Sequence, residues 1–576
     1  MSLEKAALAP RRTSFVSRAF WKKSLAQLQD EIHRDVHVRS LSLFDLIMIG
    51  IGGTVGSGVF ATAGLIARCY AGPAAVLSWI LAGIGCVLTG CAFMELSGLI
   101  PTHGSTYAYA YHALGEYPAV IAGFLLTLEY GIACAGNARA WSAKFVVWIK
   151  LMFNIDGPTW MKPPGTSIDL YACALMTVCV LVVCAGMAIG KRLINVITLT
   201  KIAVVLFIIV AGLTQFHVEY LDPFLPPSTV NAATGQVVFG WPGVMVGASA
   251  SFYGYIGYDE VCCLAGEAVN PRKNIPRAVL GTVIGAAILS IMATLSVMGM
   301  QRYNLIDVHE SYGEAFKSVG YLWASPIVET GEVLTMPVGI LIGFLAQPRV
   351  QCAMATDGLL PRFLGQLDAS GNPRVGTVVA GVILITLATF VEFQVLWNFI
   401  SLGILLAFNM TNVSLLVVRY GPAPTLHVRS WQLQLPFVLT LFGLTSFLSA
   451  LHWQHGAIAP VVATSRGGEA YAAYMSSAGV PIAAVCSVAM VAAMGILVGN
   501  PPTHFEDEDL GDEGKGLFHC PAVPYVPCIA IYFNWLLAVQ MPGHTVLMMA
   551  AWILFATITY VAYGTRHGLA STTPSA

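Results

Sequence analysis

The sequence contains few charged residues. Only 10% of its 576 residues are Asp, Glu, Lys or Arg, and 56% are apolar, whereas about a quarter are charged in an average soluble protein. This composition excludes a soluble globular protein and indicates a chain whose outer surface faces lipid. The 29 basic and 30 acidic residues nearly balance, so the net charge does not indicate a nucleic-acid partner.

Several motifs of other protein classes are also absent. The 13 cysteines include no C-x-x-C pair, and no Cys/His cluster has zinc spacing, so neither a disulfide framework nor a metal site is predicted. No phosphate-binding loop occurs, and no nucleophile and base pair indicates an enzyme, so we expect neither a catalytic site nor a cofactor. The first 40 residues are polar and lack the apolar core of a cleavable signal peptide, so membrane insertion is expected to begin at a later segment.

Long apolar runs, by contrast, are frequent. About 20 predominantly apolar residues cross the hydrocarbon core of a bilayer. Fourteen segments satisfy this requirement, approximately at residues 43–66, 74–100, 117–149, 168–190, 193–216, 241–265, 277–300, 324–349, 375–392, 394–418, 434–453, 479–499, 522–541 and 544–563. The least distinct features are the split near residue 392 and the stretch 454–478, whose Gly, Ala and Ser content is compatible with a loop. The sequence therefore predicts an all-α integral membrane protein with about 14 transmembrane helices.

The distribution of Lys and Arg predicts the orientation. Short cytoplasmic loops retain positive charge, and most loop cations fall on the cytoplasmic side if the N-terminus is inside. Residues 1–41 and 566–576 are therefore expected to be cytoplasmic tails. No KDEL or SKL address ends the chain, so the plasma membrane is the default location and a vacuolar or lysosomal membrane is the alternative.

The first apolar run is interrupted by glycine. Gly50, Gly52, Gly53, Gly56 and Gly58 lie within a short stretch, and each costs a helix about 1 kcal/mol relative to Ala. We therefore expect an unwound segment, whose freed backbone groups must be satisfied by protein, water or ligand. Close helix packing through the G-x-x-x-G pair of Gly52 and Gly56 is the alternative.

The sixth apolar run has a similar interruption. Gly254 and Gly257 are followed directly by Asp259 and Glu260. Interruptions at corresponding positions of two five-helix halves are typical of transporters built from inverted repeats, with a substrate site near the midplane. The half-helix after Gly56 would offer free N–H groups and a positive dipole end to a carboxylate. Carbonyls near residues 52–54 and 252–256 suit an ammonium group, so a zwitterion fits the predicted site.

A series of motifs follows in a fixed order along the chain. They occupy residues 45–64, 101–109 with 115–116, 128–130 with 138–142, 255–259, 266–267 with 270–276, 348–349 with 353–360, 524–527 and 533–534. As a set they resemble the cationic amino acid transporters of the amino acid, polyamine and organocation (APC) superfamily. The resemblance covers about residues 40–565.

The resemblance implies a fold and a mode of action. It implies the five-plus-five inverted repeat of the leucine-transporter type with unwound helices 1 and 6. Repeat 1 would occupy residues 42–216, repeat 2 residues 241–420, and four additional helices residues 434–565. It also implies transport of an α-amino acid by alternating access, with the amino acid and membrane lipid as the expected partners.

The resemblance also implies a site. The substrate carboxylate would bind backbone N–H groups of Gly56, Ser57 and Gly58, and the α-ammonium would bind carbonyls near Gly53 and Thr54 and those of Phe252, Tyr253 and Ile256. Lys201 matches a family lysine that replaces a sodium site by bridging the first span to the eighth, so sodium dependence is not expected. Glu329 and Glu332 depart from the family pattern, and their role stays open.

Charged residues inside spans are functional by default, because each costs about 2.5 to 3.5 kcal/mol on insertion scales. Glu129 either faces a cationic substrate side chain or pairs with Arg139 or a neighbouring helix. Asp259 either tunes the pocket or pairs inside the bundle. Lys201 either takes part in coupling or bridges backbone carbonyls. Tyr253 is expected to be an aromatic lid, with an interfacial belt residue as the alternative.

Three further carboxylates are expected near the cytoplasmic side. Glu95 and Glu116 are predicted to be scaffold or gating residues. Glu267 precedes a loop that contains Arg272 and Lys273, and a salt bridge is its expected role.

Together these features predict a sodium-independent, secondary active or facilitative transporter of cationic amino acids (arginine, lysine and ornithine), without covalent chemistry. A broad or neutral amino acid permease and an amino acid sensor are the alternatives. Proton symport, exchange and facilitated diffusion all stay open as coupling modes, and the residues do not fix the oligomeric state.

Overall fold

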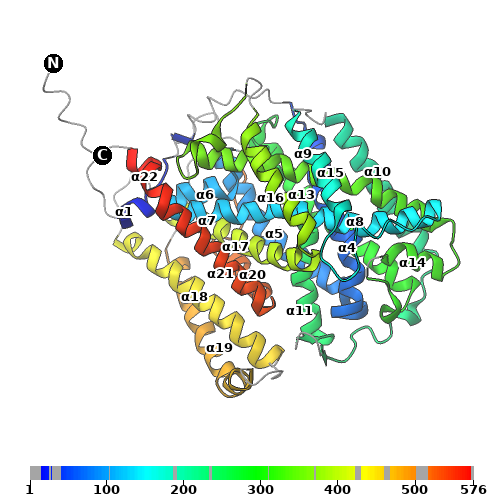
Figure 1. Ribbon diagram of the computed structural model, residues 1–576. Coiled ribbons are helices and arrows are strands. Elements are labelled where there is room, and N and C mark those ends of the chain that lie inside the picture. Colours follow the sequence, from blue (N-terminus) through cyan, green and yellow to red (C-terminus); the bar gives the residue numbers. More distant parts are fainter. Residues whose placement is uncertain are drawn as a thin grey trace.

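The computed structural model describes residues 15–24, 27–28, 40–102, 104–185, 191–231, 236–308, 310–368, 372–421, 430–459, 468–500, 502 and 517–572, with the backbone alone described at 57, 191, 430–431, 468–470 and 572. The described chain is a bundle of helices (Figure 1). Two short strands, β1 (Thr229–Val230) and β2 (Val237–Val238), form an antiparallel pair in which Thr229 lies opposite Val238.

The first part of the bundle extends to the second strand. It contains α1 (Phe15–Ala19), α3 (Leu43–Thr54), α4 (Ser57–Ile66), η1 (Ala67–Ala71), η2 (Gly72–Ala74), α5 (Ala75–Leu99), α6 (Thr106–Ala113), α7 (Glu116–Leu126), η3 (Thr127–Ile132), α8 (Ala133–Phe153), α9 (Leu170–Cys184), α10 (Lys191–Leu213) and η4 (Val218–Leu221).

The second part follows the strands. It contains α11 (Gly240–Ser251), η5 (Phe252–Tyr255), α12 (Glu260–Cys263), α13 (Pro271–Met300), η6 (Tyr303–Leu305), α14 (Ser311–Ser318), α15 (Ala324–Thr356), η7 (Arg362–Gly365), α16 (Arg374–Phe390), α17 (Phe393–Tyr420), η8 (Ser430–Gln434), α18 (Leu435–Trp453), η9 (Gln454–Ile458), α19 (Gly468–Val498), α20 (Tyr525–Ala538), α21 (Gly543–Thr559), η11 (Tyr560–Gly564), α22 (Thr565–His567) and α23 (Leu569–Thr572).

Many of these helices are long enough to cross a membrane. Within the described ranges, nine have the required length and apolar composition: Gly58–Leu99, Glu116–Phe153, Arg192–Leu213, Pro271–Met300, Ala324–Thr356, Phe393–Tyr420, Gln432–Ile458, Tyr471–Val498 and Gly543–Ser571. Four shorter apolar helices are Leu43–Thr54, Leu170–Cys184, Arg374–Phe390 and Tyr525–Ala538. The predicted all-helical membrane protein is confirmed at this level.

Local sequence explains where α3 begins. Ser42 and Asp45 form a capping box, in which the Asp45 N–H donates to Ser42 Oγ at 3.2 Å and the Ser42 N–H donates to Asp45 Oδ2 at 3.0 Å. Asn195 of α10 donates to the other Asp45 oxygen at 2.7 Å. The start of the first apolar helix is thus fixed both by its own cap and by a neighbouring helix.

Helix α19 begins earlier than the sequence predicts. Residues 454–478 are compatible with a loop by composition, but η9 occupies 454–458 and α19 begins at Gly468, while residues 460–467 lie outside the described part. The small residues serve close packing instead, because a Cβ on Gly456 would lie 3.1 Å from the Gly479 Cα. His452 and His455 also hydrogen-bond with the hydroxyls of Tyr474 and Tyr471, at 3.0 and 2.8 Å.

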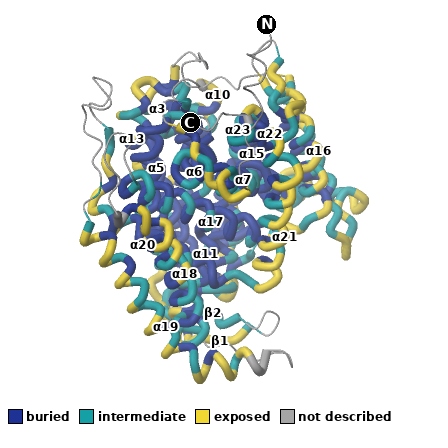
Figure 2. Tube along the Cα trace, turned by 90° about the vertical axis from the view of Figure 1, so that its left-hand side faces the viewer, coloured by how far each residue is buried: buried dark blue, intermediate teal, exposed yellow. Residues whose placement is uncertain are grey.

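Burial is highest in the middle of the bundle. Figure 2 shows buried residues around α5, α6, α7 and α17, whereas exposed residues follow α18, α19 and α21. The exposed residues of α19 and α21 include Val488 and Leu547, as expected of helices that face lipid. Helices α18 and α19 pack against each other at one edge of the molecule (Figure 1).

The two ends of the described chain lie together. Figure 1 shows α1 and α22 at one end of the bundle and α14 at the opposite end. Arg18 of α1 donates to the Thr565 carbonyl at 2.9 Å, and the ring of Phe15 packs edge-on against Tyr560, with the centroids 6.2 Å apart.

Candidate functional site

The first apolar helix is broken at the predicted position. Helix α3 ends at Thr54 and α4 begins at Ser57, and between them Val55 is extended while Gly56 is neither helical nor a regular strand residue. The N-cap residue of α4 is Gly56, which has no side chain that could cap the first turn, and an uncapped helix N-terminus suits an anion. The side chain of Ser57 lies outside the described residues.

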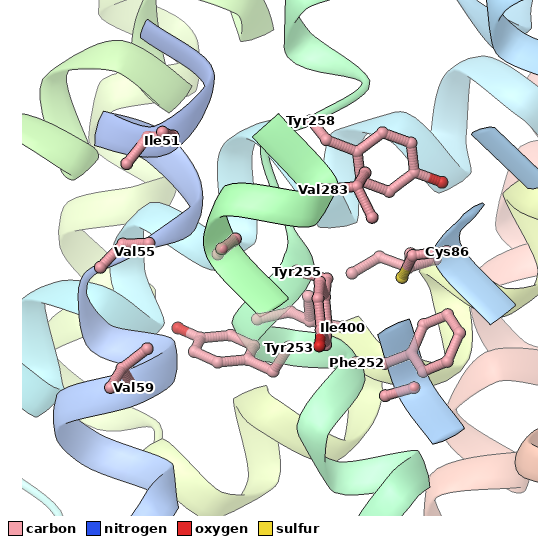
Figure 3. Close-up of a cluster of buried hydrophobic side chains, with 14 of the residues drawn as sticks. Ile51, Val55, Val59, Cys86, Phe252, Tyr253, Tyr255, Tyr258, Val283 and Ile400 are labelled. Carbon is pink, nitrogen blue, oxygen red and sulfur yellow. The ribbon is translucent and has the colours of Figure 1, made fainter. Parts of the chain in front are cut away.

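A second break interrupts the chain after α11. The 3₁₀ turn η5 follows at Phe252–Tyr255, and a turn at Gly257, whose φ is +111°, leads into α12 at Glu260. The two breaks touch each other through glycine, because a Cβ on Gly58 would overlap the Gly254 Cα. Both predicted interruptions are therefore present, and they lie side by side (Figure 3).

A small cavity lies beside the breaks. It is lined by Gly53, Thr54, Glu129, Ala133, Cys134, Asn137, Tyr253, Ile256, Glu260, Gly339 and Gly343. Five of these were predicted as site residues, namely Gly53, Thr54, Glu129, Tyr253 and Ile256. Four other predicted residues, Gly56, Gly58, Phe252 and Asp259, do not belong to this lining.

Tyr253 and Phe252 point to opposite sides of the second break (Figure 3). The Tyr253 hydroxyl donates to Asn137 Oδ1 of α8, so Tyr253 reaches across the cavity wall. The Phe252 ring packs against Phe408 of α17 with a centroid distance of 6.1 Å. Phe252 can therefore serve the cavity only through its backbone. Asn137 was missed at the sequence level because it is an isolated polar residue in an apolar run.

Glu129 is buried in the cavity wall, with 1% of its surface exposed. No Lys or Arg of the described residues pairs with it, and its carboxyl group is in hydrogen-bonding contact with that of Asp259. The predicted alternative of a pair with Arg139 is wrong, because Arg139 pairs with Asp169 at 3.4 Å and donates to the carbonyls of Ser167 and Thr389. Glu129 thus faces the cavity without a counter-ion.

Asp259 and Glu260 are adjacent in sequence but face different surroundings. Asp259 is fully buried and accepts a hydrogen bond of 2.7 Å from the Tyr130 hydroxyl. Glu260 lines the cavity, where its Oε2 would lie 2.9 Å from a Cβ on Gly53 and has no donor among the described residues. The sequence showed two carboxylates after the break, but the turn at Gly257 decides which one enters the cavity. We call Glu129, Asp259 and Glu260 the inner carboxylates.

Lys201 of α10 is fully buried beside the first break. Its ammonium donates to the Gly52 carbonyl at 2.8 Å, and a Cβ on Gly56 would lie 3.3 Å from its Nζ. Helix α10 packs against both α3 and α15. The hydrogen bond to the first span agrees with a carbonyl bridge, while the bridge to the eighth span stays a prediction.

The other predicted carboxylates connect helices. Glu95 pairs with Arg419 of α17 at 2.6 Å and accepts the Cys520 N–H at 2.6 Å. Glu116 accepts hydrogen bonds from Tyr111, Tyr560 and the Ala570 N–H at 2.9, 3.2 and 3.1 Å. Glu267 forms the expected salt bridge, but its partner is Arg349 of α15, at 2.7 Å, and not a cation of the adjacent loop. Helix α15 brings Arg349 beside Glu267 in the fold, which sequence proximity does not reveal.

Glu329 and Glu332, the departures from the family pattern, belong to a second buried group near α14. Glu332 pairs with Lys144 of α8 at 2.7 Å, and both side chains are less than 5% exposed. Glu329 accepts from Ser325 at 2.8 Å and lies 3.7 Å from Lys317. Glu310 lies in the electrostatic environment of the same residues. We call Glu310, Glu329 and Glu332 the outer carboxylates.

Comparison with known proteins gives the family. Residues 41–464 match the model of the amino acid permease family, and residues 518–568 match the model described as the C-terminus of AA_permease. The chain is 29% identical over 568 residues to the vacuolar cationic amino acid transporter 4 of Arabidopsis thaliana, covering 92% of each chain. It is 28% identical over 586 residues to cationic amino acid transporter 4 of Homo sapiens, covering 94% of this chain and 90% of the relative.

A bacterial relative has a different name. The chain is 32% identical over 410 residues to the methylthioribose transporter of Bacillus subtilis (strain 168), covering 70% of this chain and 86% of the relative. The family match covers most of the chain and agrees with the helical membrane fold. The protein is therefore a multi-pass integral membrane transporter, not an enzyme, and it belongs to the amino acid permease family.

Proposed function

We propose that this protein transports cationic amino acids (arginine, lysine and ornithine) by alternating access, without sodium, at the cavity between the two broken helices. The observation that carries the proposal is the carboxylate of Glu129 in the cavity wall, which no Lys or Arg of the described residues neutralises. A buried carboxylate without a counter-ion is costly, and a guanidinium or ammonium side chain would supply the missing charge. The names of the relatives from Arabidopsis thaliana and Homo sapiens support the same substrate class.

The two ends of the substrate fit the two breaks. We place the α-carboxylate at the N–H groups of Gly56, Ser57 and Gly58, where no Gly56 side-chain bond caps α4. We place the α-ammonium at the carbonyls of Gly53 and Thr54 and of Phe252, Tyr253 and Ile256. Tyr253 would close over the bound amino acid, which its position in the cavity lining supports. Asp259 would act through Tyr130, to which it is hydrogen-bonded.

Lys201 would occupy the place of a sodium ion. Its ammonium already satisfies the Gly52 carbonyl at the end of α3, which is the kind of broken-helix carbonyl that coordinates Na⁺ in related folds. A resident cation at this position makes a dissolved one unnecessary. Glu95, Glu116 and Glu267, which join helices through ion pairs and hydrogen bonds, would keep the scaffold in place.

The fold that we propose for this activity has fourteen membrane crossings. Helices α3 and α4 would form one crossing, and α11 to α12 another. Repeat 1 would span residues 42–216, repeat 2 residues 241–420, and four accessory helices residues 434–565. An even number of crossings places both ends of the chain on one side, and the contact between α1 and α22 supports this arrangement. We assign that side to the cytoplasm, with the plasma membrane as location and a vacuolar membrane as the alternative.

Uptake of radiolabelled arginine into proteoliposomes tests the proposal. We expect saturable uptake that excess lysine blocks, that excess leucine leaves unchanged, and that persists when choline replaces sodium. An imposed pH gradient decides whether a proton is coupled. Absence of arginine uptake by protein that is folded in the vesicles, or inhibition by leucine alone, would contradict the proposal.

A broad or neutral permease is the second candidate. The bacterial relative that is 32% identical is named for methylthioribose, which is not a cationic amino acid. The same vesicles loaded with leucine or methylthioribose distinguish the two candidates. Uptake of either compound at a kcat/KM above that of arginine would favour the second.

The contact between the breaks offers a structural test. Because a Cβ on Gly58 would overlap the Gly254 backbone, we expect Gly58→Ala to abolish arginine uptake by separating α4 from η5. Gly443→Ala is the matched control, since nothing lies within 4 Å of a Cβ at that position of α18. Equal uptake by both variants would show that the close contact is not required for transport.

A further inference from the structure

The cavity contains a second carboxylate, Glu260, that the proposed carboxylate and ammonium positions do not use. We propose that Glu260 sets the charge class of the substrate: with Glu129 it binds the two cationic groups of an amino acid whose net charge is +1, and it rejects uncharged isosteres. This inference rests on the proposed function and deepens it.

The local backbone explains why Glu260 enters the cavity. Gly257 adopts a φ of +111°, a conformation that side-chain-bearing residues rarely adopt, and the chain turns there before α12. The turn directs Asp259 to the Tyr130 hydroxyl and leaves Glu260, the first residue of α12, on the cavity side. Two consecutive carboxylates are thus separated into one that is hydrogen-bonded and one that faces the cavity.

Glycines on two other helices make room for the Glu260 carboxylate. A Cβ on Gly53 of α3 would lie 2.9 Å from Oε2, and a Cβ on Gly343 of α15 would lie 3.4 Å from Oε1. Both glycines line the same cavity. Larger residues at these positions would crowd the carboxylate, so the packing keeps it accessible from the cavity.

No cation neutralises Glu260 within the part of the chain that the structure describes. Glu260 is 6% exposed, and its Oε2 has no hydrogen-bond donor there. Lys201 donates to the Gly52 carbonyl, and Cys134 donates its thiol to the Tyr130 carbonyl at 3.0 Å. The Glu260 carboxylate therefore requires either a proton or the donors of a bound ligand.

The charges in the cavity match one class of amino acid. Glu129 and Glu260 present two carboxyl groups to the cavity, and arginine, lysine and ornithine each carry an α-ammonium and a cationic side chain. A neutral amino acid has one ammonium group and would leave one carboxylate without a donor, which costs far more than the loss of a favourable contact. Arginine has the further advantage that its guanidinium offers five donors in a fixed plane.

Uptake of arginine and of citrulline provides the test, because citrulline has nearly the same shape but a neutral urea in place of the guanidinium. We compare kcat/KM for both compounds in proteoliposomes containing the wild type or Glu260→Gln. We expect the substitution to lower the preference for arginine over citrulline at least tenfold, mainly through loss of arginine uptake. Glu314→Gln, which neutralises a partly exposed carboxylate of α14, is the control and should leave the preference unchanged.

Two outcomes would overturn the inference while the proposed function stands. If Glu260→Gln keeps the preference for arginine but no longer responds to an imposed pH gradient, Glu260 carries a proton and does not select the substrate. If the variant is folded and loses arginine uptake and citrulline uptake equally, Glu260 has only a structural role. Absence of arginine uptake by the wild type would instead contradict the proposed function.

A second variant keeps the test decisive if Glu260→Gln does not fold. Glu260→Asp keeps the charge and withdraws the carboxylate by one methylene group. We expect it to retain the preference for arginine over citrulline while raising the KM for arginine at least threefold. An unchanged KM for arginine would overturn the inference.

Discussion

The inner and outer carboxylates are both buried, yet they differ in what neutralises them. The outer group contains Lys144, paired with Glu332, and Lys317 near Glu329. In the described part of the chain the inner carboxylates have no lysine or arginine partner, and Asp259 accepts a hydrogen bond from Tyr130. A buried carboxylate that has a resident cation is complete without a ligand, whereas one without a cation requires a proton or a bound cation. Under the proposed function, the comparison separates carboxylates that are neutralised within the fold from carboxylates that a cationic substrate would neutralise.

The largest effect is expected from removing Lys144, the cation that pairs with the outer carboxylate Glu332. Lys144→Met removes the cation of a fully buried pair, so Glu332 is left as an uncompensated charge, and we expect the free energy of unfolding to fall by about 3 to 5 kcal/mol. Thermal unfolding of the purified protein in detergent measures this loss. The double variant Lys144→Met/Glu332→Gln should recover part of it. A melting temperature equal to that of the wild type in the single variant would show that the pair does not stabilise the fold.

The second prediction concerns Glu129, one of the inner carboxylates. Here we expect a loss of transport without a loss of stability. Glu129→Gln removes a charge that no Lys or Arg of the described residues neutralises, so we expect an unchanged or slightly higher melting temperature. Uptake of arginine should fall about tenfold, the equivalent of about 1.4 kcal/mol, while uptake of leucine changes little. Paired uptake assays with the two amino acids check this. An equal loss for both would assign Glu129 to the scaffold and remove the contrast between the two groups.

The third prediction uses pH. Burial raises the pKa of Glu310 from 4.5 to about 8, with Glu332, Glu329 and Asp307 adding to the rise and Lys144 opposing it. Between these two values the folded protein holds a proton that the unfolded chain releases, so the free energy of unfolding decreases as the pH rises from 5 to 8. Melting temperatures over this range should decline less steeply in Glu310→Gln than in the wild type. The same slope of melting temperature against pH in both proteins would contradict the prediction. Glu314→Gln is the control and should keep the slope of the wild type.

The smallest effect is expected for Lys317, the more exposed of the two lysines beside the outer carboxylates. Lys317 is 27% exposed and lies 2.8 Å from Glu314 and 3.7 Å from Glu329. Solvent screens such pairs, so Lys317→Met should cost less than about 1 kcal/mol. Thermal unfolding of Lys317→Met and of Lys144→Met under the same conditions gives the comparison. A loss as large as that of Lys144→Met would show that exposure does not separate the two lysines.

Features that depend on local sequence could be predicted. The breaks near Gly56 and Gly254 follow from clustered glycine, which weakens a helix wherever it occurs. The prediction of Glu95 and Glu116 as scaffold or gating residues follows from their position near the ends of spans, and in the structure both connect to other helices. The presence of a site near Glu129 follows from a charge in an apolar run.

Features that depend on packing between distant segments could not be predicted. The sequence left open whether Asp259 tunes the pocket or pairs inside the bundle, and in the structure Glu260, after the turn at Gly257, lines the cavity. Arg349 reaches Glu267 only because α15 crosses the end of the second break. Asn137 gives no signal in the sequence beyond its polarity, and its role depends on the reach of Tyr253 from another helix.

The glycine contact between the breaks has a mechanical consequence. At Gly58 and Gly254 backbone meets backbone with no side chain between them, so there is no soft layer in which one segment could slide past the other. Helix α4 and the turn η5 must then rotate as one rigid unit. The cavity would open along its other walls, where α8 contributes Asn137 and α15 contributes Gly339 and Gly343. Under the proposed alternating access, the pivot and the moving wall would then belong to different helices.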